Sequence, residues 1–225
     1  MNKIEYWFLD APIRLKIPFH WLSASNVDEM LNRPHHHLSR SELLVVLERM
    51  FERGDLFLEY RNRSEQSYRI QVPSRSEIEA ALYLPHDQWM DQSEHVFYGV
   101  TGRGGALWET LSHPQWDHFY DEGYGINPYE GEMTASTRGL IEEWLALVPY
   151  DPSIKAIVPE SLRWSVLQPW QATYWKQLPI GYHIAFTYLQ LTEAEELARP
   201  TPPDWVRACY QHSRRWYTSY LEPES

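Results

Sequence analysis

The sequence predicts an α+β protein made of two parts, one covering residues 1–120 and an aromatic-rich part covering residues 121–225. In the first part, apolar residues recur at helical spacing over 39–53, and a strand-like alternation follows at once. In the second part, a helical pattern over 136–148 precedes two further alternating segments. The composition, with 43% hydrophobic and 23% charged residues, is that of a globular chain.

The first helices are expected on either side of Pro34. The segment before it has enough apolar side chains for a short helix or two, which the proline ends. Ser39 and Glu42 form a capping box, and the helix that they open ends at Gly54. Its apolar face holds Leu43, Val46, Leu47, Met50 and Phe51. We expect Leu47, Met50 and Phe51 to be buried against a strand over 56–60.

A hairpin and a strand–helix junction are expected next. Residues 56–61 and 68–72 alternate as two strands, joined by the polar turn RNRSEQS. A helix with its own capping box is expected over 74–84. The third strand is expected over 96–100, and Thr101 is placed to cap the helix that follows.

The region from Leu38 to Glu109 resembles the winged helix-turn-helix domain of regulators of the MarR and PadR type. Residues that match the strand–helix junction of those domains are Tyr98, Val100, Thr101, Gly104, Leu107 and Glu109, and Ser39 to Gly54 resembles their recognition helix. The resemblance implies a winged-helix-like first part and a DNA-binding regulator. The sequence departs from it where about 40 residues, including a helix, separate the first strand from the junction strand.

The second part begins with an acidic stretch, because eight acids and two bases lie between Asp121 and Glu160. The helix over 136–148 turns Leu140, Ile141, Trp144, Leu145 and Val148 inward. Strands are expected over 161–168 and 182–189, then a short helix opened by a capping box at Thr192, and a last helix to about Tyr220. Residues 170–186 resemble stretches of uncharacterised bacterial proteins, a resemblance that implies no activity.

The charges make nucleic acid an unlikely partner. Five bases and five acids lie between Ser39 and Arg63, and the whole chain has a formal net charge of -11. A helix and wing that read DNA normally carry net positive charge, since phosphate contacts supply most of the affinity. A winged-helix transcription regulator is therefore the alternative function, behind protein binding.

The sequence points to no enzyme, no cofactor and no metal site. It has no G-x-S-x-G, G-x-x-x-x-G-K-[ST] or H-E-x-x-H motif, and the glycines of TGRGGALWE fit neither the dinucleotide nor the P-loop fingerprint. The side chains of His35, His36 and His37 are expected to diverge, and His113 with Asp117 to lie at the start of a helix. The single cysteine, Cys209, is expected to be a small buried group in a helix. An unrecognised enzyme is the third possibility.

We expect a cytoplasmic protein. No stretch approaches the roughly 18 to 20 apolar residues that a membrane span requires, and Asp10 and Arg14 interrupt what would be the apolar core of a signal peptide. A chain with one cysteine also suits a reducing compartment.

The sequence is therefore interpreted as a non-enzymatic binding protein for a basic protein partner, of the bacterial immunity or antitoxin kind. Acidity and an excess of aromatic residues, 11 Trp and 15 Tyr, motivate this. The candidate binding residues are Trp170, Tyr174 and Trp175 in the loop PWQATYWKQLPIG, with Glu142 and Glu143 on the helix. The aromatic loop is expected to cover a sheet, with a partner-facing anchor as the alternative; exposure of the two tryptophans decides between these roles.

Overall fold

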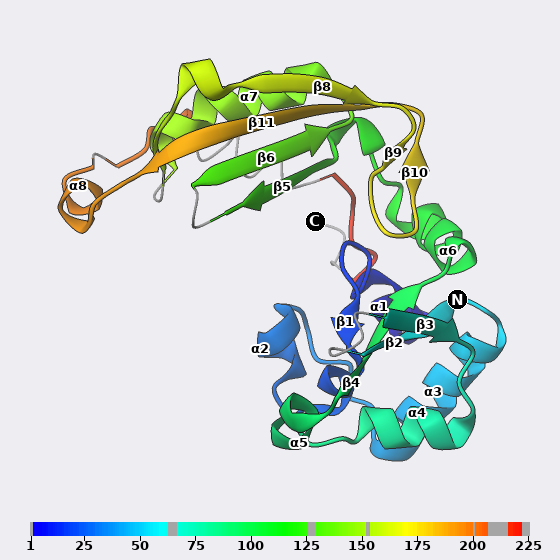
Figure 1. Ribbon diagram of the computed structural model, residues 1–225. Helices are drawn as coiled ribbons and strands as arrows, with labels where there is room; N and C mark the ends of the chain where they lie inside the picture. Colours follow the sequence, from blue (N-terminus) through cyan, green and yellow to red (C-terminus); the bar gives the residue numbers. More distant parts are fainter. Residues whose placement is uncertain are drawn as a thin grey trace. The chain divides into compact units, whose positions relative to one another are not determined.

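A computed structural model describes residues 2–62, 67–125, 129–151, 154–199, 201–206 and 216–221 (Figure 1). It contains helices and strands in both halves, so the protein is α+β. The chain divides into two compact units: unit 1 comprises Met1–Ser112, Thr173–Lys176 and Ser219–Ser225, and unit 2 comprises His113–Ala172 and Gln177–Thr218. The sequence placed the boundary after residue 120. The structure divides the chain after Ser112, where helix α6 ends.

Unit 1 combines helices with one sheet. The helices are α1 (Lys3–Asp10), η1 (Phe19–Ser23), α2 (Val27–Leu31), α3 (Arg40–Glu52), α4 (Arg75–Leu82), α5 (His86–Asp91) and α6 (Gly102–Ser112). The predicted capping boxes at Ser39 and Ser74 are both present, and Thr101 accepts a hydrogen bond from the Gly104 N–H at 3.0 Å. The sequence did not predict α1 or α5. In α1, Tyr6, Trp7, Phe8 and Leu9 are consecutive and all buried.

The sheet of unit 1 is antiparallel, in the order β1-β4-β2-β3. Its strands are β1 (Ile17–Pro18), β2 (Leu56–Asn62), β3 (Ser67–Gln71) and β4 (Glu94–Val100). Leu47 and Met50 are 0% exposed and Phe51 is 1% exposed, which confirms the predicted phase of α3. Of the predicted turn between the two hairpin strands, residues 63–66 lie outside the described residues.

Unit 2 is a five-stranded antiparallel sheet covered on one face by α7 (Arg138–Leu147). Its strands are β5 (Tyr120–Tyr124), β6 (Glu130–Ala135), β7 (Ile154–Ile157), β8 (Arg163–Leu167) and β11 (Gly181–Gln190), with a separate pair β9 (Trp170–Gln171) and β10 (Gln177–Leu178). Short helical elements are η2 (Trp116–His118), η3 (Val148–Tyr150), η4 (Pro159–Ser161) and α8 (Glu193–Leu197). The long strand β11 pairs with β6, β7 and β8, and therefore organises the unit.

The core of unit 2 lies between α7 and the sheet. It is formed by Met133, Ala135, Ile141, Trp144, Val148, Ile154, Ile184, Phe186 and Tyr188. The predicted strands β8 and β11 and the helices α7 and α8 are present, whereas β5, β6 and β7 were not predicted. The last helix was predicted to extend to about Tyr220, but residues 216–221 are not helical. The middle of that predicted helix, which includes Cys209, lies outside the described residues.

Candidate functional site

Trp170, a candidate binding residue of the aromatic loop, is buried in unit 2. It is 5% exposed, and its ring lies 5.8 Å from that of Phe119, centroid to centroid. A Cβ atom on Gly181 would overlap the Trp170 ring, so the indole fills space against the first residue of β11. Trp170 therefore packs inside its unit.

Tyr174 and Trp175 belong to unit 1, where their polar atoms are already bonded. The Tyr174 hydroxyl donates to the Pro12 carbonyl oxygen at 2.8 Å and accepts from the Val100 N–H at 2.7 Å, and burial raises the pKa of this phenol. The Trp175 indole N–H donates to the Ile13 carbonyl oxygen at 2.9 Å, and its ring lies where a side chain on Gly105 would be. Neither tryptophan of the loop is largely exposed, as a covering segment requires.

Glu142 and Glu143 lie exposed on α7. Glu142 pairs with Arg138 one turn earlier, with Nε to Oε1 2.8 Å, and the Arg138 guanidinium stacks on Trp164 at 4.7 Å from the ring centroid. The charge of Glu142 is thus compensated within its own helix. The five candidate residues are divided between the two units: Tyr174 and Trp175 lie in unit 1, and the other three lie in unit 2.

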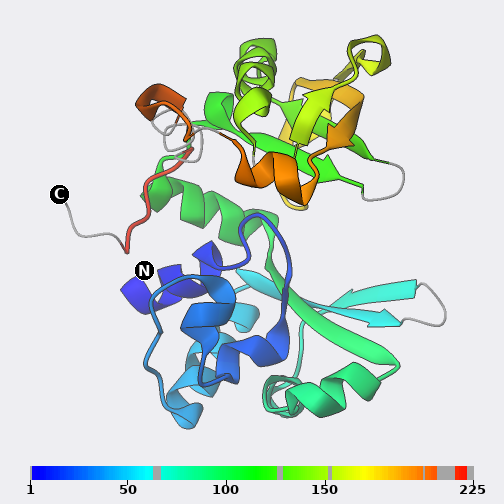
Figure 2. The same cartoon turned by 90° about the vertical axis from the view of Figure 1, so that its left-hand side faces the viewer.

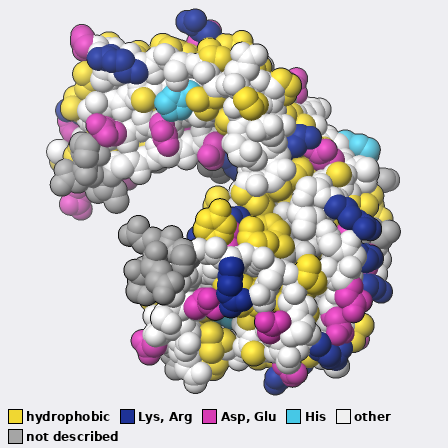
Figure 3. All heavy atoms as spheres, turned by 45° about the vertical axis from the view of Figure 1, so that its right-hand side comes forward, with side chains coloured by type: hydrophobic (Ala, Val, Ile, Leu, Met, Phe, Trp, Pro, Cys, Tyr) yellow, Lys and Arg dark blue, Asp and Glu magenta, His cyan; other side chains and the backbone are white. Residues whose placement is uncertain are grey.

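In unit 1, eight ion pairs join arginines to carboxylates of the same unit. The pairs are Arg33–Asp10, Arg40–Glu79, Arg49–Glu5, Arg53–Glu5, Arg61–Glu59, Arg69–Glu94, Arg75–Glu48 and Arg103–Asp55. Figure 3 shows the result as dark blue and magenta side chains lying next to one another in the lower part of the view. A phosphate backbone would have to compete with these internal partners.

Unit 2 differs, because it contains an acidic hairpin whose carboxylates lack arginine partners of this kind among the described residues. We use this name for β5 and β6, whose exposed carboxylates are Asp121, Glu122, Glu130 and Glu132. The sequence has no lysine or arginine between Arg103 and Arg138. Over the residues that the structure describes, none of the four carboxylates pairs with a lysine or arginine. The hairpin is thus an uncompensated negative surface.

The strand register places these carboxylates on both sides of the hairpin. Asp121 and Glu132 project from the sheet face opposite α7, and Glu132 extends across Gly123 of the neighbouring strand, where a Cβ would be 3.5 Å from its Oε1. Glu122 projects to the other side and accepts a hydrogen bond from the Tyr124 hydroxyl at 3.2 Å.

Two tyrosines at the end of the hairpin are half-exposed and rigidly supported. Tyr124 is 41% exposed and Tyr129 is 40% exposed. Both rings pack against Tyr188, with centroid separations of 5.9 and 5.6 Å, and Tyr124 also lies 6.5 Å from Phe186. These rings combine exposed area with fixed orientation, which is what an interface anchor needs.

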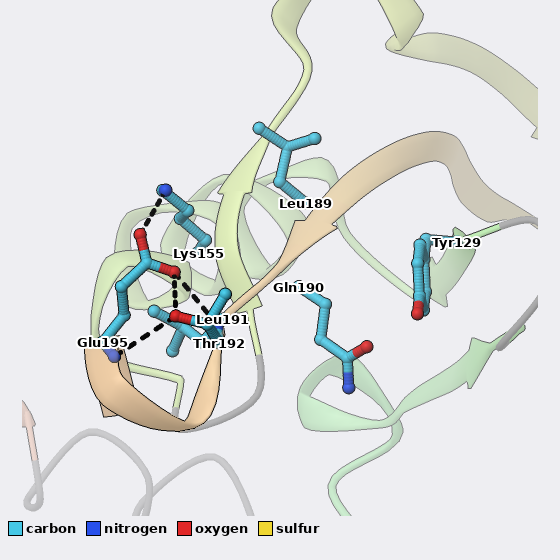
Figure 4. A pocket seen from close by; sticks show the side chains of 7 residues that line it. All are labelled: Tyr129, Lys155, Leu189, Gln190, Leu191, Thr192 and Glu195. Carbon is cyan, nitrogen blue, oxygen red and sulfur yellow. Dashed lines mark hydrogen bonds and ion pairs between the residues drawn. The ribbon is translucent and has the colours of Figure 1, made fainter. Parts of the chain in front are cut away.

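Tyr129 also lines an open hollow of about 580 Å³ at the end of β11 (Figure 4). The other lining residues are Lys155, Leu189, Gln190, Leu191, Thr192 and Glu195. Lys155 pairs with Glu195, and hydrogen bonds from Lys155 and Thr192 lower the pKa of Glu195 to about 2. Because Lys155 and Glu195 neutralise each other, the charges that line this hollow would contribute little to the binding of a charged ligand.

A Ser–His–Glu row crosses the sheet face opposite α7. The Ser165 hydroxyl is 3.1 Å from Nδ1 of His183, and Nε2 of His183 is 3.5 Å from Oε2 of Glu132. Ser165 and Glu132 are exposed, so water surrounds the groups that a hydrolase would have to enclose. We interpret the row as cross-strand pairing on a solvated face.

The metal candidates differ from their predicted geometry. The rings of His35 and His37 do not diverge but stack, with centroids 4.8 Å apart, because His37 takes a left-handed φ of 55°. His113 follows α6 and no helix begins there; Asp117 lies in the short η2. The described residues contain no group of three or more His, Cys, Asp or Glu side chains placed to hold a metal ion.

Comparison with known proteins adds no assignment. The chain matches no protein-family model, and neither a curated protein nor a solved structure shows significant similarity to it. Among the described helices, none has the length and apolar character needed to cross a membrane. The sequence marked the acidic stretch, but it gave no signal for β5 and β6, and so the hairpin surface was missed.

Proposed function

We propose that this protein is a non-enzymatic binding protein and that the acidic hairpin contacts a basic protein partner. The observation that carries the proposal is the contrast in pairing. Arginines in unit 1 are matched by carboxylates, whereas the hairpin presents four exposed carboxylates without a lysine or arginine. Uncompensated charge of one sign on a surface favours encounter with the opposite sign.

The tyrosines supply what charge alone does not. Exposed carboxylates raise association rates and select partners, but affinity comes mainly from aromatic anchors that become buried. Tyr124 and Tyr129 are held by ring contacts beneath them and therefore lose little conformational freedom on binding. A cytoplasmic immunity or antitoxin protein that masks the nucleic-acid-binding surface of a toxin would have this combination.

The test is a charge reversal with a matched control. The partner is first isolated by affinity capture on the wild-type chain at low ionic strength, with the product of the adjacent gene as the first candidate. The double variant Glu130→Lys/Glu132→Lys should then bind at least about tenfold more weakly, a loss of roughly 1.4 kcal/mol. The control is Glu142→Lys/Glu143→Lys, which makes the same charge change on α7.

The two variants are expected to differ in their affinity for the partner. If the hairpin is the interface, the α7 variant binds within about twofold of wild type, and salt weakens only the binding that the hairpin supports. Equal losses in both variants would show a nonspecific charge effect. A loss confined to the α7 variant would place the interface at Glu142 and Glu143 instead.

A winged-helix DNA-binding regulator is the second candidate. It is favoured by the order of the capped helix α3, the β2–β3 hairpin and the β4–α6 junction. Gly104 has a packing role at this junction, since a Cβ there would overlap the carbonyl oxygen of Asp55. The paired arginines count against this function, and binding to duplex DNA tests it directly.

A further inference from the structure

The open hollow beside Tyr129 is built where β11 ends. A shift of register between Leu189 and Gln190 interrupts the pairing of β11 with β7, and such irregularities re-aim side chains at the ends of sheets. The chain then passes through Leu191 and Thr192 into α8. Figure 2 shows unit 2 from this end, with α8 in orange and the strands of the acidic hairpin in green. The hollow is thus lined by backbone that leaves the sheet and by the end of the hairpin.

The charged groups of the hollow are occupied by one another. Lys155 pairs with Glu195, and the Glu195 carboxylate also accepts hydrogen bonds from the Thr192 N–H at 3.0 Å and the Thr192 hydroxyl at 2.9 Å. Figure 4 shows these three side chains at one side of the hollow and Tyr129 at the other. The surface that remains for a ligand is therefore mainly apolar. It includes Leu189, which is 51% exposed, and the Tyr129 ring, which is 40% exposed.

Tyr129 connects the hollow to the acidic hairpin. Its carbonyl oxygen accepts from the Tyr188 N–H at 2.9 Å and its ring packs on the Tyr188 ring, so both the backbone and the side chain are held in place. Glu130 follows directly, and its carboxylate has no lysine or arginine partner among the described residues. A mainly apolar surface is thus continuous with an uncompensated negative one.

We propose that the hollow takes one large apolar side chain of the protein partner, while lysines or arginines beside it in the partner's sequence lie on the acidic hairpin. This inference rests on the proposed function and adds the kind of segment that is recognised: a leucine, methionine or phenylalanine flanked by basic residues. The two parts of such a segment match the two parts of the surface. The carboxylates attract the bases, and the hollow, whose own charges are paired, favours an uncharged group.

A side chain suits this hollow better than a free small molecule. The volume of about 580 Å³ lies within the range of roughly 300 to 1,000 Å³ of ligand sites, but the hollow is open. Small-molecule sites bury most of the ligand, which an open hollow cannot do. A side chain carried by a protein arrives with neighbouring residues that cover the hollow and exclude water.

Two synthetic peptides test the recognised segment. GKKLKKG and GKKAKKG, acetylated and amidated at their ends, are titrated into the ¹⁵N-labelled full chain and followed by NMR. The leucine peptide should bind at least about fivefold more tightly than the alanine peptide, because leucine adds apolar surface that the hollow can bury. The backbone amide signals of Leu189 and Gln190 should shift with the leucine peptide and stay in place with the alanine peptide.

A matched pair of variants tests the hollow itself. Leu189→Ser should abolish the preference for the leucine peptide and leave binding of the alanine peptide within about twofold of wild type. Leu197→Ser is the control, since Leu197 is 82% exposed on α8 and does not line the hollow. It should keep the full preference. Both leucines are exposed, so both variants should fold, which circular dichroism checks.

The variant Glu130→Lys/Glu132→Lys separates this inference from the proposed function. It should weaken binding of both peptides and keep the preference for leucine. If wild type binds both peptides alike and this variant weakens both, the hollow has no part in recognition, although the acidic hairpin keeps its proposed role. If this variant weakens neither peptide, the hairpin is not the charged surface and the proposed function fails with it. A preference that survives Leu189→Ser, or no binding of either peptide at millimolar concentration, would also overturn the inference.

Discussion

At the scale of single residues, hydrogen bonds fix the protonation of His36. Its Nδ1 accepts from the Leu38 N–H at 3.0 Å, so the proton of the neutral ring is on Nε2, which lies 2.9 Å from the Leu22 carbonyl oxygen. Burial among Trp7 and Phe8, together with the neighbouring His35 and His37, holds the pKa of His36 below its usual range. If Nδ1 also carried a proton, that proton would point at the Leu38 N–H, and the hydrogen bond from Leu38 to His36 would be lost.

This geometry predicts a loss of stability on mild acidification. Since the folded pKa of His36 is lowered, the unfolded chain takes up a proton that the folded chain resists, and stability falls as pH drops below about 6.5. The free energy of unfolding, measured in urea at pH 7.5 and 5.5, should fall less in His36→Gln than in wild type. The exposed His37→Gln leaves the burial of His36, the largest cause of its lowered pKa, in place and should keep most of the wild-type pH dependence; an equal pH dependence in all three proteins would contradict the assignment.

At the scale of elements, the sequence predicts well where the signal is local. The capping boxes at Ser39, Ser74 and Thr192 predict the starts of α3, α4 and α8, because a cap needs only residues three apart. The strands β5 and β6, YDEGY and EGEMTA, were missed because acids and glycines dilute their alternation. β6 in turn pairs with β11, which lies some fifty residues further along the chain.

The segment 173–176 shows the same limit more strongly. Tyr174 bonds to Pro12 across 162 positions of sequence, and no local pattern reveals such a contact. The loop was expected to cover a sheet, but the sequence did not predict that its centre would belong to unit 1. The candidate residues of the loop and of α7 are therefore divided between the two units, which the sequence did not predict.

Trp175 should consequently contribute to the stability of unit 1. Trp175→Ala removes an indole that fills the space over Gly105 and leaves the Ile13 carbonyl oxygen without its donor, which should cost about 3 kcal/mol. Trp164→Ala is the matched control, since Trp164 is 38% exposed and its loss should cost under about 1 kcal/mol. Denaturant unfolding followed by circular dichroism measures both; similar values for the two variants would contradict the packing role of Trp175.

At the scale of the whole molecule, composition predicted the sign of the charge but not its distribution. A net charge of -11 disfavours a polyanionic partner, yet it cannot show which carboxylates are neutralised. The structure separates a unit in which arginines are paired with carboxylates from a hairpin whose carboxylates, among the described residues, have no lysine or arginine partner. The binding surface is therefore expected on the hairpin, where a basic partner meets charge that no neighbouring arginine or lysine offsets.

The same distribution predicts weak DNA binding. A phosphate contact in unit 1 requires an arginine such as Arg49 or Arg75 to leave a carboxylate, which reduces the gain from releasing counterions. Fluorescence anisotropy with random duplex at physiological salt should give a dissociation constant no tighter than roughly 10 µM. Freeing a base should strengthen binding: Glu48→Gln, which releases Arg75, should bind more tightly than wild type and with a steeper salt dependence. Nanomolar binding of the wild-type chain to DNA upstream of its own gene would instead make the winged-helix regulator the leading function. Such binding would show that the ion pairs of the arginines do not limit the affinity for DNA.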